Sequence, residues 1–169
     1  MTDFSVPGYG RGPFFIFGTK EARKRHCRGI VKRPELLENK AMKSVWIEFN
    51  PNPMGRRVGD CAVRAVAKAL DVTWEDAFLL IAANAFAMGD IISADSVWGS
   101  VLRQHGFYRS AVPDTCPDCY TAADFCRDHP TGTYVLSFGG AGGIGHVATV
   151  RAGRLFDSWD SSDLVPQFY

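Results

Sequence analysis

A cysteine, a histidine and an aspartate occur in three segments whose residue types fit thiol chemistry. The first segment is Gly59-Asp60-Cys61, which opens a helical stretch. A thiol in the first turn of a helix lies near unpaired backbone N–H groups and the positive end of the helix dipole. Both lower the pKa of a thiol and favour the thiolate. The segment predicts a nucleophile at Cys61, with buried packing as the alternative for a cysteine on an apolar helix.

The second segment places His146 at the start of a strand, directly after the glycine-rich residues 139–145. An imidazole beside backbone without side chains is open to a cleft and is suited to act as a general base for a thiol. A surface histidine at a strand end is the alternative interpretation.

The third segment is Asp157-Ser158-Trp159. If Ala152-Gly153 is a two-residue hairpin turn, Asp157 and His146 become diagonal neighbours on one face of the sheet. A carboxylate there would accept a hydrogen bond from one ring nitrogen and leave the other for Cys61. A one-residue bulge would instead place Asp160 on that face.

Cysteine at a helix N-terminus, then histidine on a strand, then Asp-Ser-Trp on the next strand resembles the papain-like cysteine peptidases. Those peptidases carry Asn-Ser-Trp in the third segment, and Asp replaces Asn elsewhere in the superfamily. The chain also resembles small proteins of gut bacteria and their phages, through Asn-Pro-Asn-Pro at residues 50–53 leading to Gly59-Asp60-Cys61 and through Asp-Ser-Trp-Asp at residues 157–160. The resemblance covers about residues 50–162 and implies a papain-like hydrolase.

By this resemblance, Cys61, His146 and Asp157 form a catalytic triad that hydrolyses a peptide, isopeptide or related amide without a cofactor. One departure concerns the oxyanion donor. The family has glutamine six residues before its nucleophile, where this chain has Gly55. Asn52 or Asn50 is the candidate side-chain donor, with the backbone N–H of Cys61 as a second donor.

The arrangement of the secondary structure predicts the α+β class, with a helical N-terminal half followed by an antiparallel β-sheet. A strand is expected over residues 44–49. Helices are expected over residues 61–70, 74–88, 95–105 and 122–129, with Asp60, Thr73 and Thr121 as N-caps. Later strands are expected over residues 134–138, 146–151 and 154–159.

The composition of the 169 residues, with 46% hydrophobic residues and a net charge of +1, excludes a disordered chain and a coiled coil. The sequence has no run of 18 apolar residues, so we expect no membrane-spanning helix. The first residues do not resemble a secretory signal. The five cysteines are odd in number, which favours a reduced, cytoplasmic protein over a disulfide framework.

The charge is unevenly distributed. Residues 1–33 contain eight Lys/Arg and two Asp/Glu, a net of +6, whereas residues 34–169 have a net of −5. We expect a basic arm over residues 1–45, packed in part through Phe14 to Phe17, and a catalytic domain over residues 46–169. The alternative function is a non-enzymatic papain-like interaction module whose arm binds nucleic acid or a phage or host protein.

A second group of residues has zinc-ligand types: Cys116, Cys119, Cys126 and His129. However, Cys126 shares a helical face with Ala122 and Phe125, which favours a core position. We therefore expect no metal at these residues.

Overall fold

The computed structural model describes residues 44–113, 119–139 and 145–169, which all belong to one unit spanning residues 35–169. Most of the predicted basic arm, including Phe14 to Phe17, lies outside the described residues. The predictions of its packing and of its nucleic-acid contact therefore stay predictions.

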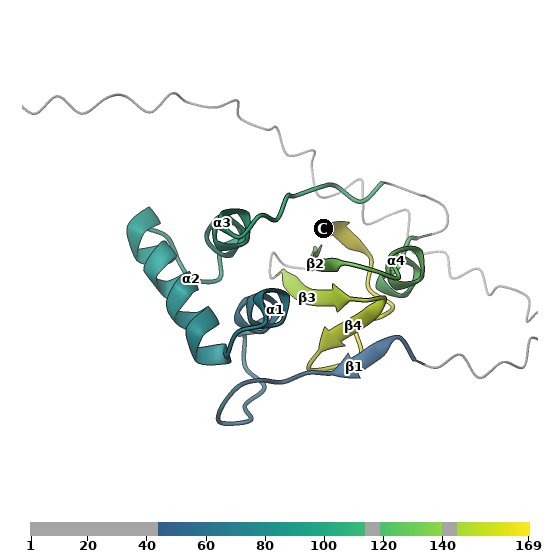
Figure 1. Cartoon of the computed structure of the whole chain (residues 1–169), viewed down its shortest axis with the longest axis horizontal. Coiled ribbons are helices and arrows are strands. Elements are labelled where there is room, and N and C mark those ends of the chain that lie inside the picture. The colour runs from purple at the N-terminus through teal and green to yellow at the C-terminus, as the bar shows by residue number, and fades with distance from the viewer. Residues whose placement is uncertain (1–43, 114–118, 140–144) are drawn as a thin grey trace, which may run out of the picture. The chain divides into compact units, whose positions relative to one another are not determined.

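The described residues form an α+β structure in which a mixed five-stranded sheet carries helices on both sides (Figure 1). The first strand and the three helices of the N-terminal half are β1 (Trp46–Glu48), α1 (Cys61–Leu70), α2 (Trp74–Met88) and α3 (Asp95–Gln104). The later elements are α4 (Ala122–Asp128), β2 (Thr133–Phe138), β3 (His146–Arg151), β4 (Arg154–Asp157) and β5 (Pro166–Phe168).

The strand order is β1-β4-β3-β2-β5. Its central strands β2, β3 and β4 are antiparallel, as predicted, but β1 pairs with β4 in parallel. The expectation of a purely antiparallel sheet is therefore wrong at this edge. The β3–β4 hairpin leaves one edge of β4 without a partner, and β1 provides backbone hydrogen-bonding groups to that edge.

The α1, α2 and α3 helices lie on one face of the sheet and α4 lies on the other (Figure 1). Successive side chains of a strand point to opposite faces. Accordingly, Val135 and Val147 pack with the three-helix layer, whereas Leu136 and Ala148 pack with α4. The two separate cores make the sheet the central layer of the described structure.

Two of the predicted helix caps are present. Thr73 accepts a hydrogen bond from the Asp76 N–H at 3.1 Å, and Thr121 forms a complete capping box with Asp124. Asp60 occupies the predicted N-cap position of α1, but its side chain makes no capping hydrogen bond. The prediction for Asp60 is correct in position and wrong in role, because its carboxylate binds other groups.

The turn between β3 and β4 has the predicted two residues. Ala152 and Gly153 both have positive φ, at 50° and 70°, which matches the twist of a tight hairpin. Arg151 lies opposite Arg154, and Thr149 lies opposite Phe156. This register contains no bulge, so the carboxylate of Asp157 falls on the predicted face.

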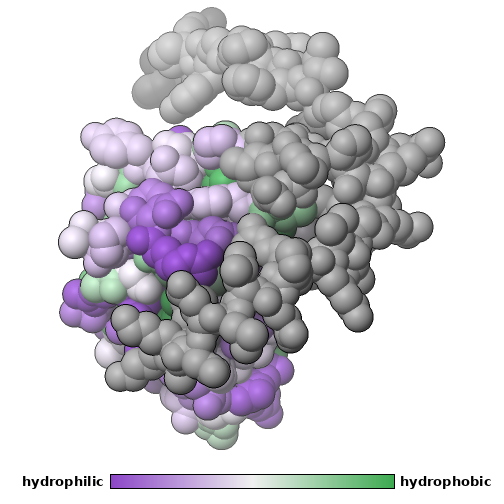
Figure 2. Space-filling view, turned by 90° about the vertical axis from the view of Figure 1, so that its right-hand side faces the viewer, coloured by the Kyte–Doolittle hydropathy of each residue, from purple (hydrophilic) through white to green (hydrophobic). Residues whose placement is uncertain are grey.

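In the part of the chain that is described, no helix has both the length and the apolar composition that a bilayer span requires. The described surface that is visible in Figure 2 is mainly hydrophilic, with only small hydrophobic areas.

Candidate active site

Cys61 is the first residue of α1, and its thiol meets the beginning of β3. Burial alone raises the pKa of this thiol. Hydrogen bonds with the His146 ring and the Val147 N–H, together with the positive charges of His146 and Arg64, outweigh burial and lower the pKa overall. The position thus favours the thiolate, which is the nucleophilic form.

His146 begins β3 and connects the thiol to the carboxylate. Its Nε2 atom lies 2.5 Å from Oδ2 of Asp157, which leaves Nδ1 as the ring nitrogen for Cys61. Burial lowers the pKa of His146, but the hydrogen bonds and negative charges of Asp157 and Cys61 raise it to about 9. The ring therefore carries a proton at neutral pH.

Two aromatic rings hold the imidazole in place. The Phe138 ring lies 5.8 Å from it between centroids, with 21° between the planes. The Trp159 ring lies at 5.1 Å, tilted by 39°. These contacts limit rotation of the ring, so that the hydrogen bond to Asp157 also fixes the direction of Nδ1.

Asp157 ends β4 and is only 3% exposed. Besides His146, its carboxylate accepts hydrogen bonds from the Ser161 hydroxyl and the Ser158 N–H, each at 2.7 Å. Its backbone carbonyl accepts from the Trp46 indole N–H at 3.1 Å, which ties the residue to β1. The bonds to the side chain hold the carboxylate in one orientation, and the bond to the carbonyl holds the backbone of the residue.

Asp160, the alternative third residue, does not join this group. Its side chain is exposed and accepts a hydrogen bond from the Ser162 N–H at 3.1 Å. The structure thus brings together Cys61, His146 and Asp157, as the unbulged register predicts. It adds Ser161, whose hydroxyl donates to the Asp157 carboxylate. The sequence did not indicate this role, because it depends on how the chain reverses direction after β4.

The two asparagines before α1 differ in how their amides are used. Asn50 donates both of its side-chain hydrogen bonds to backbone carbonyls, those of Gly55 and Arg56, at 3.3 and 3.2 Å. Asn52 donates one hydrogen bond to Asp60 at 3.1 Å and lines the cleft beside Cys61. Among the described residues, no group accepts a hydrogen bond from the second N–H of the Asn52 amide, so Asn52 is the predicted oxyanion donor with an N–H group left for a ligand.

A cleft of about 940 Å³ surrounds the thiol, within the range of ligand-binding pockets. On the helical side its wall is largely apolar. The apolar side chains of this wall are Met54, Val58, Trp74, Phe78, Ile91, Ile92 and Trp98. Gly145, His146 and Val147 line the opposite side. The cleft can therefore take a ligand with a bulky apolar group next to Cys61.

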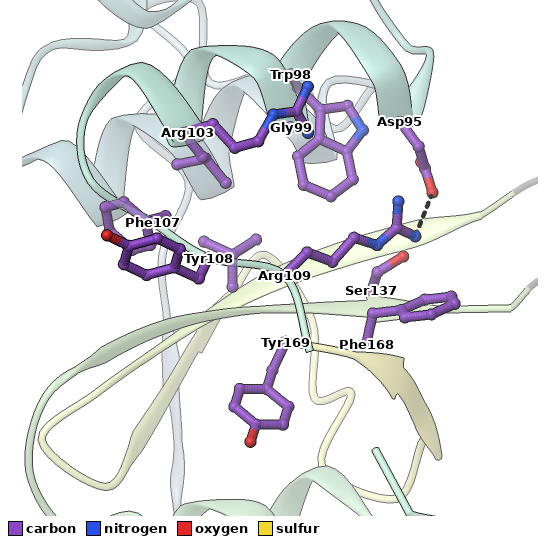
Figure 3. Close-up of a pocket in the computed structure, with 12 residues that line it drawn as sticks. Asp95, Trp98, Gly99, Arg103, Phe107, Tyr108, Arg109, Ser137, Phe168 and Tyr169 are labelled. Carbon is purple, nitrogen blue, oxygen red and sulfur yellow. Dashed lines mark ion pairs between the residues drawn. The ribbon is translucent and has the colours of Figure 1, made fainter. Parts of the chain in front are cut away.

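A second cavity, lined by residues of α3, β2 and β5, has a volume of only about 40 Å³. Figure 3 shows the Arg109 side chain beside it, in an ion pair with Asp95 at 3.5 Å. The same guanidinium lies 4.0 Å from the centre of the Phe168 ring. This cavity has room for little more than water and contains neither a cysteine nor a histidine.

Of the four zinc-type residues, Cys119, Cys126 and His129 lie within the described residues. Cys126 lies on the buried face of α4, where burial raises the pKa of its thiol to about 11. The His129 ring stacks on Phe125 at 3.8 Å. Within the described ranges, no group of three or more His, Cys, Asp or Glu could hold a metal ion, and Cys116 lies outside those ranges.

Comparisons of the chain with protein-family models, curated proteins and solved structures found no match. Inference about function therefore rests on the residues and geometry of this site.

Proposed function

We propose that the protein is a papain-like cysteine hydrolase that cleaves an amide bond. The observation that carries the proposal is the continuous line of contacts from Cys61 through His146 to Asp157, with 2.5 Å between the ring and the carboxylate. Together with a lowered thiol pKa, a raised imidazole pKa and an adjoining cleft, this arrangement supports nucleophilic catalysis.

In the first half of the reaction, the Cys61 thiolate attacks the substrate carbonyl carbon and a C–S bond forms. The Cys61 backbone N–H and the Asn52 amide would donate hydrogen bonds to the resulting oxyanion. The His146 imidazolium then gives its proton to the leaving nitrogen, and the C–N bond breaks. The products of this half are a free amine and a thioester on Cys61.

In the second half, neutral His146 takes a proton from water, and the hydroxide formed attacks the thioester carbonyl. The C–S bond breaks, the acid leaves, and Cys61 returns to the thiolate beside the imidazolium. Asp157 keeps the ring oriented and stabilises its charge throughout. The apolar wall of the cleft favours substrates whose acyl part carries a large apolar side chain.

The test uses an acyl donor that requires no knowledge of the natural substrate. We expect p-nitrophenyl hexanoate to release a burst of about one equivalent of p-nitrophenolate and to leave a hexanoyl thioester on Cys61, detected by intact mass. Cys61→Ala and His146→Ala should abolish the burst. Cys119→Ala, which alters an exposed thiol elsewhere, should keep it.

A wild-type protein without a burst, whose Cys61 is alkylated no faster than Cys119, would contradict the proposal. That result would favour the interaction-module alternative, in which the fold binds a partner without chemistry.

A further inference from the structure

A buried ion pair occupies the first turn of α1. Asp60, which precedes Cys61, pairs with Arg64, and the two residues are only 8% and 6% exposed. Burying two charges has a desolvation cost that often equals or exceeds their attraction. In addition, Asp60 forgoes the capping hydrogen bond that its position allows. Stability alone does not explain this arrangement.

The Asp60 carboxylate connects the separate parts of the cleft wall. One oxygen, Oδ2, accepts hydrogen bonds from the Asn52 amide at 3.1 Å and from the Trp74 indole N–H at 3.0 Å. The other oxygen binds Arg64. Asn52 and Trp74 line the cleft from the loop before α1 and from the start of α2. One side chain thus links this loop, α1 and α2.

These bonds determine how the Asn52 amide is oriented. Its Oδ1 accepts from the backbone N–H groups of Met54 at 3.0 Å and Arg56 at 3.4 Å. Its Nδ2 faces the carboxylate of Asp60, which can only accept. If the amide were flipped, its NH₂ group would face the N–H groups of Met54 and Arg56, and its oxygen would face the carboxylate of Asp60. In the described structure, the second N–H of Nδ2 makes no hydrogen bond, so it is available to a ligand.

Asp60 also holds Arg64 three residues after the thiol. Among the charged side chains, His146 and Arg64 are the two whose positive charge favours the thiolate of Cys61. Arg64 Nη1 also donates to the Val58 carbonyl at 3.4 Å, whereas Arg64 Nε is buried without a hydrogen bond in the described structure. The pair therefore holds the guanidinium in place at the expense of one unsatisfied N–H.

We propose that Asp60 is a positioning residue that fixes the Asn52 amide as an oxyanion donor in the cleft beside Cys61. This inference rests on the proposed function. In it, Asn52 and Asp60 together take the role of the glutamine that papain-like peptidases have six residues before the nucleophile, where this chain has Gly55. It predicts that Asn52 and Asp60 act as one unit in acyl transfer.

Two measurements separate oxyanion donation from formation of the thiolate. Alkylation by iodoacetamide as a function of pH reports the Cys61 thiolate and needs no oxyanion donor. Acylation by p-nitrophenyl hexanoate requires both the thiolate and an oxyanion donor. Asn52→Ala should slow acylation by about 100-fold and leave alkylation within about twofold. Asp60→Leu/Arg64→Met should slow acylation similarly, because the Asn52 amide loses the acceptor that orients it.

The decisive comparison is the triple variant Asn52→Ala/Asp60→Leu/Arg64→Met. If Asp60 acts through Asn52, the triple variant should acylate about as fast as the pair variant, because the unit is already broken. Asp60→Asn/Arg64→Met keeps an amide oxygen as acceptor and should recover most of the acylation rate. This second pair variant still tests the inference if the leucine variant does not fold.

The matched control is Glu48→Gln/Arg57→Met, which removes an exposed ion pair of 2.7 Å near the same loop. It should leave both rates unchanged. The inference is overturned if Asp60→Leu/Arg64→Met is acylated as fast as this control. It is also overturned if the fold-loss in acylation rate of the triple variant equals the product of the losses of Asn52→Ala and of the pair variant. A wild-type protein that is not acylated would instead mean that the proposed function has failed.

Discussion

Ser161 donates a hydrogen bond of 2.7 Å to the same Asp157 oxygen that accepts the ring N–H of His146. Both Ser161 and Asp157 are buried, so the hydroxyl and the carboxylate cannot exchange this bond for water. The orientation of the imidazole thus depends on a residue beyond the three that carry the proposed chemistry.

Ser161→Ala should destabilise the fold by about 1–3 kcal/mol, since it removes a buried hydrogen bond to a charged group. It should also lower the rate of p-nitrophenyl hexanoate acylation, because Asp157 loses one of the bonds that fix it. The measurements are urea unfolding and the acylation rate. Ser162→Ala is the control, because no hydrogen bond of its side chain supports the triad. Equal effects of the two variants would exclude this role.

Asp157→Ala should slow Cys61 alkylation at neutral pH by about 10- to 100-fold, because the ring loses both its orientation and its stabilising charge. Asp157→Asn should fall between this variant and the wild type. Its amide oxygen can still accept from His146, but its NH₂ group would face the donating N–H of Ser158. Asp160→Ala should have no effect, and a larger loss for Asp160→Ala than for Asp157→Ala would overturn the register.

The pH dependence follows from the directions of the two pKa values. The thiolate–imidazolium pair exists above the lowered pKa of Cys61 and below the pKa of His146, at about 9. Amide hydrolysis or ester acylation should therefore rise through the first value and fall above about pH 9. Iodoacetamide should label Cys61 well below pH 9, whereas Cys126, whose pKa is raised to about 11, should react slowly.

The same titration affects stability. The pKa of His146 is raised from 6.5 to about 9 in the folded protein. Its stabilising contribution is therefore fully present below about pH 6.5 and is lost as the pH rises through about 9. His146→Gln should remove this part of the dependence in urea unfolding measured between pH 6 and 10. An unchanged slope in that variant would contradict the assignment.

The local parts of this fold were predictable from the sequence. Thr73 and Thr121 cap their helices because hydroxyl and N–H groups meet within one turn. The register that places Asp157 near His146 follows from a two-residue turn. In these cases the residues that determine the structure lie within a few positions of each other, so spacing alone was sufficient.

The remaining features depend on contacts between distant segments. Nothing in the sequence of β1 indicates that it joins β4 in parallel, and β5 is too short to show alternation. Asp60 looked like an ordinary helix cap. It is instead a buried acceptor because Trp74 and Asn52 approach from other elements. Local spacing does not predict a role that depends on such tertiary partners.

Substrate preference provides the last prediction. Ile91 and Ile92 line the cleft on the helical side, yet their side chains remain substantially exposed, at 68% and 40%. An acyl chain bound there would cover them, and each methylene buried contributes about 0.8 kcal/mol. Wild-type protein should therefore be acylated by p-nitrophenyl hexanoate at least about tenfold faster than by p-nitrophenyl acetate.

Ile91→Asn/Ile92→Asn should reduce this preference for the hexanoyl ester to near unity while retaining the acetyl rate, because the catalytic groups are untouched. Phe86→Asn is the matched control. Phe86 is 91% exposed on α2 and does not line the cleft, so its replacement should leave the ratio of the two rates unchanged. If both variants lower the ratio equally, the ester chain does not bind this wall. If the double isoleucine variant keeps the ratio, the acyl group of the substrate lies elsewhere in the cleft.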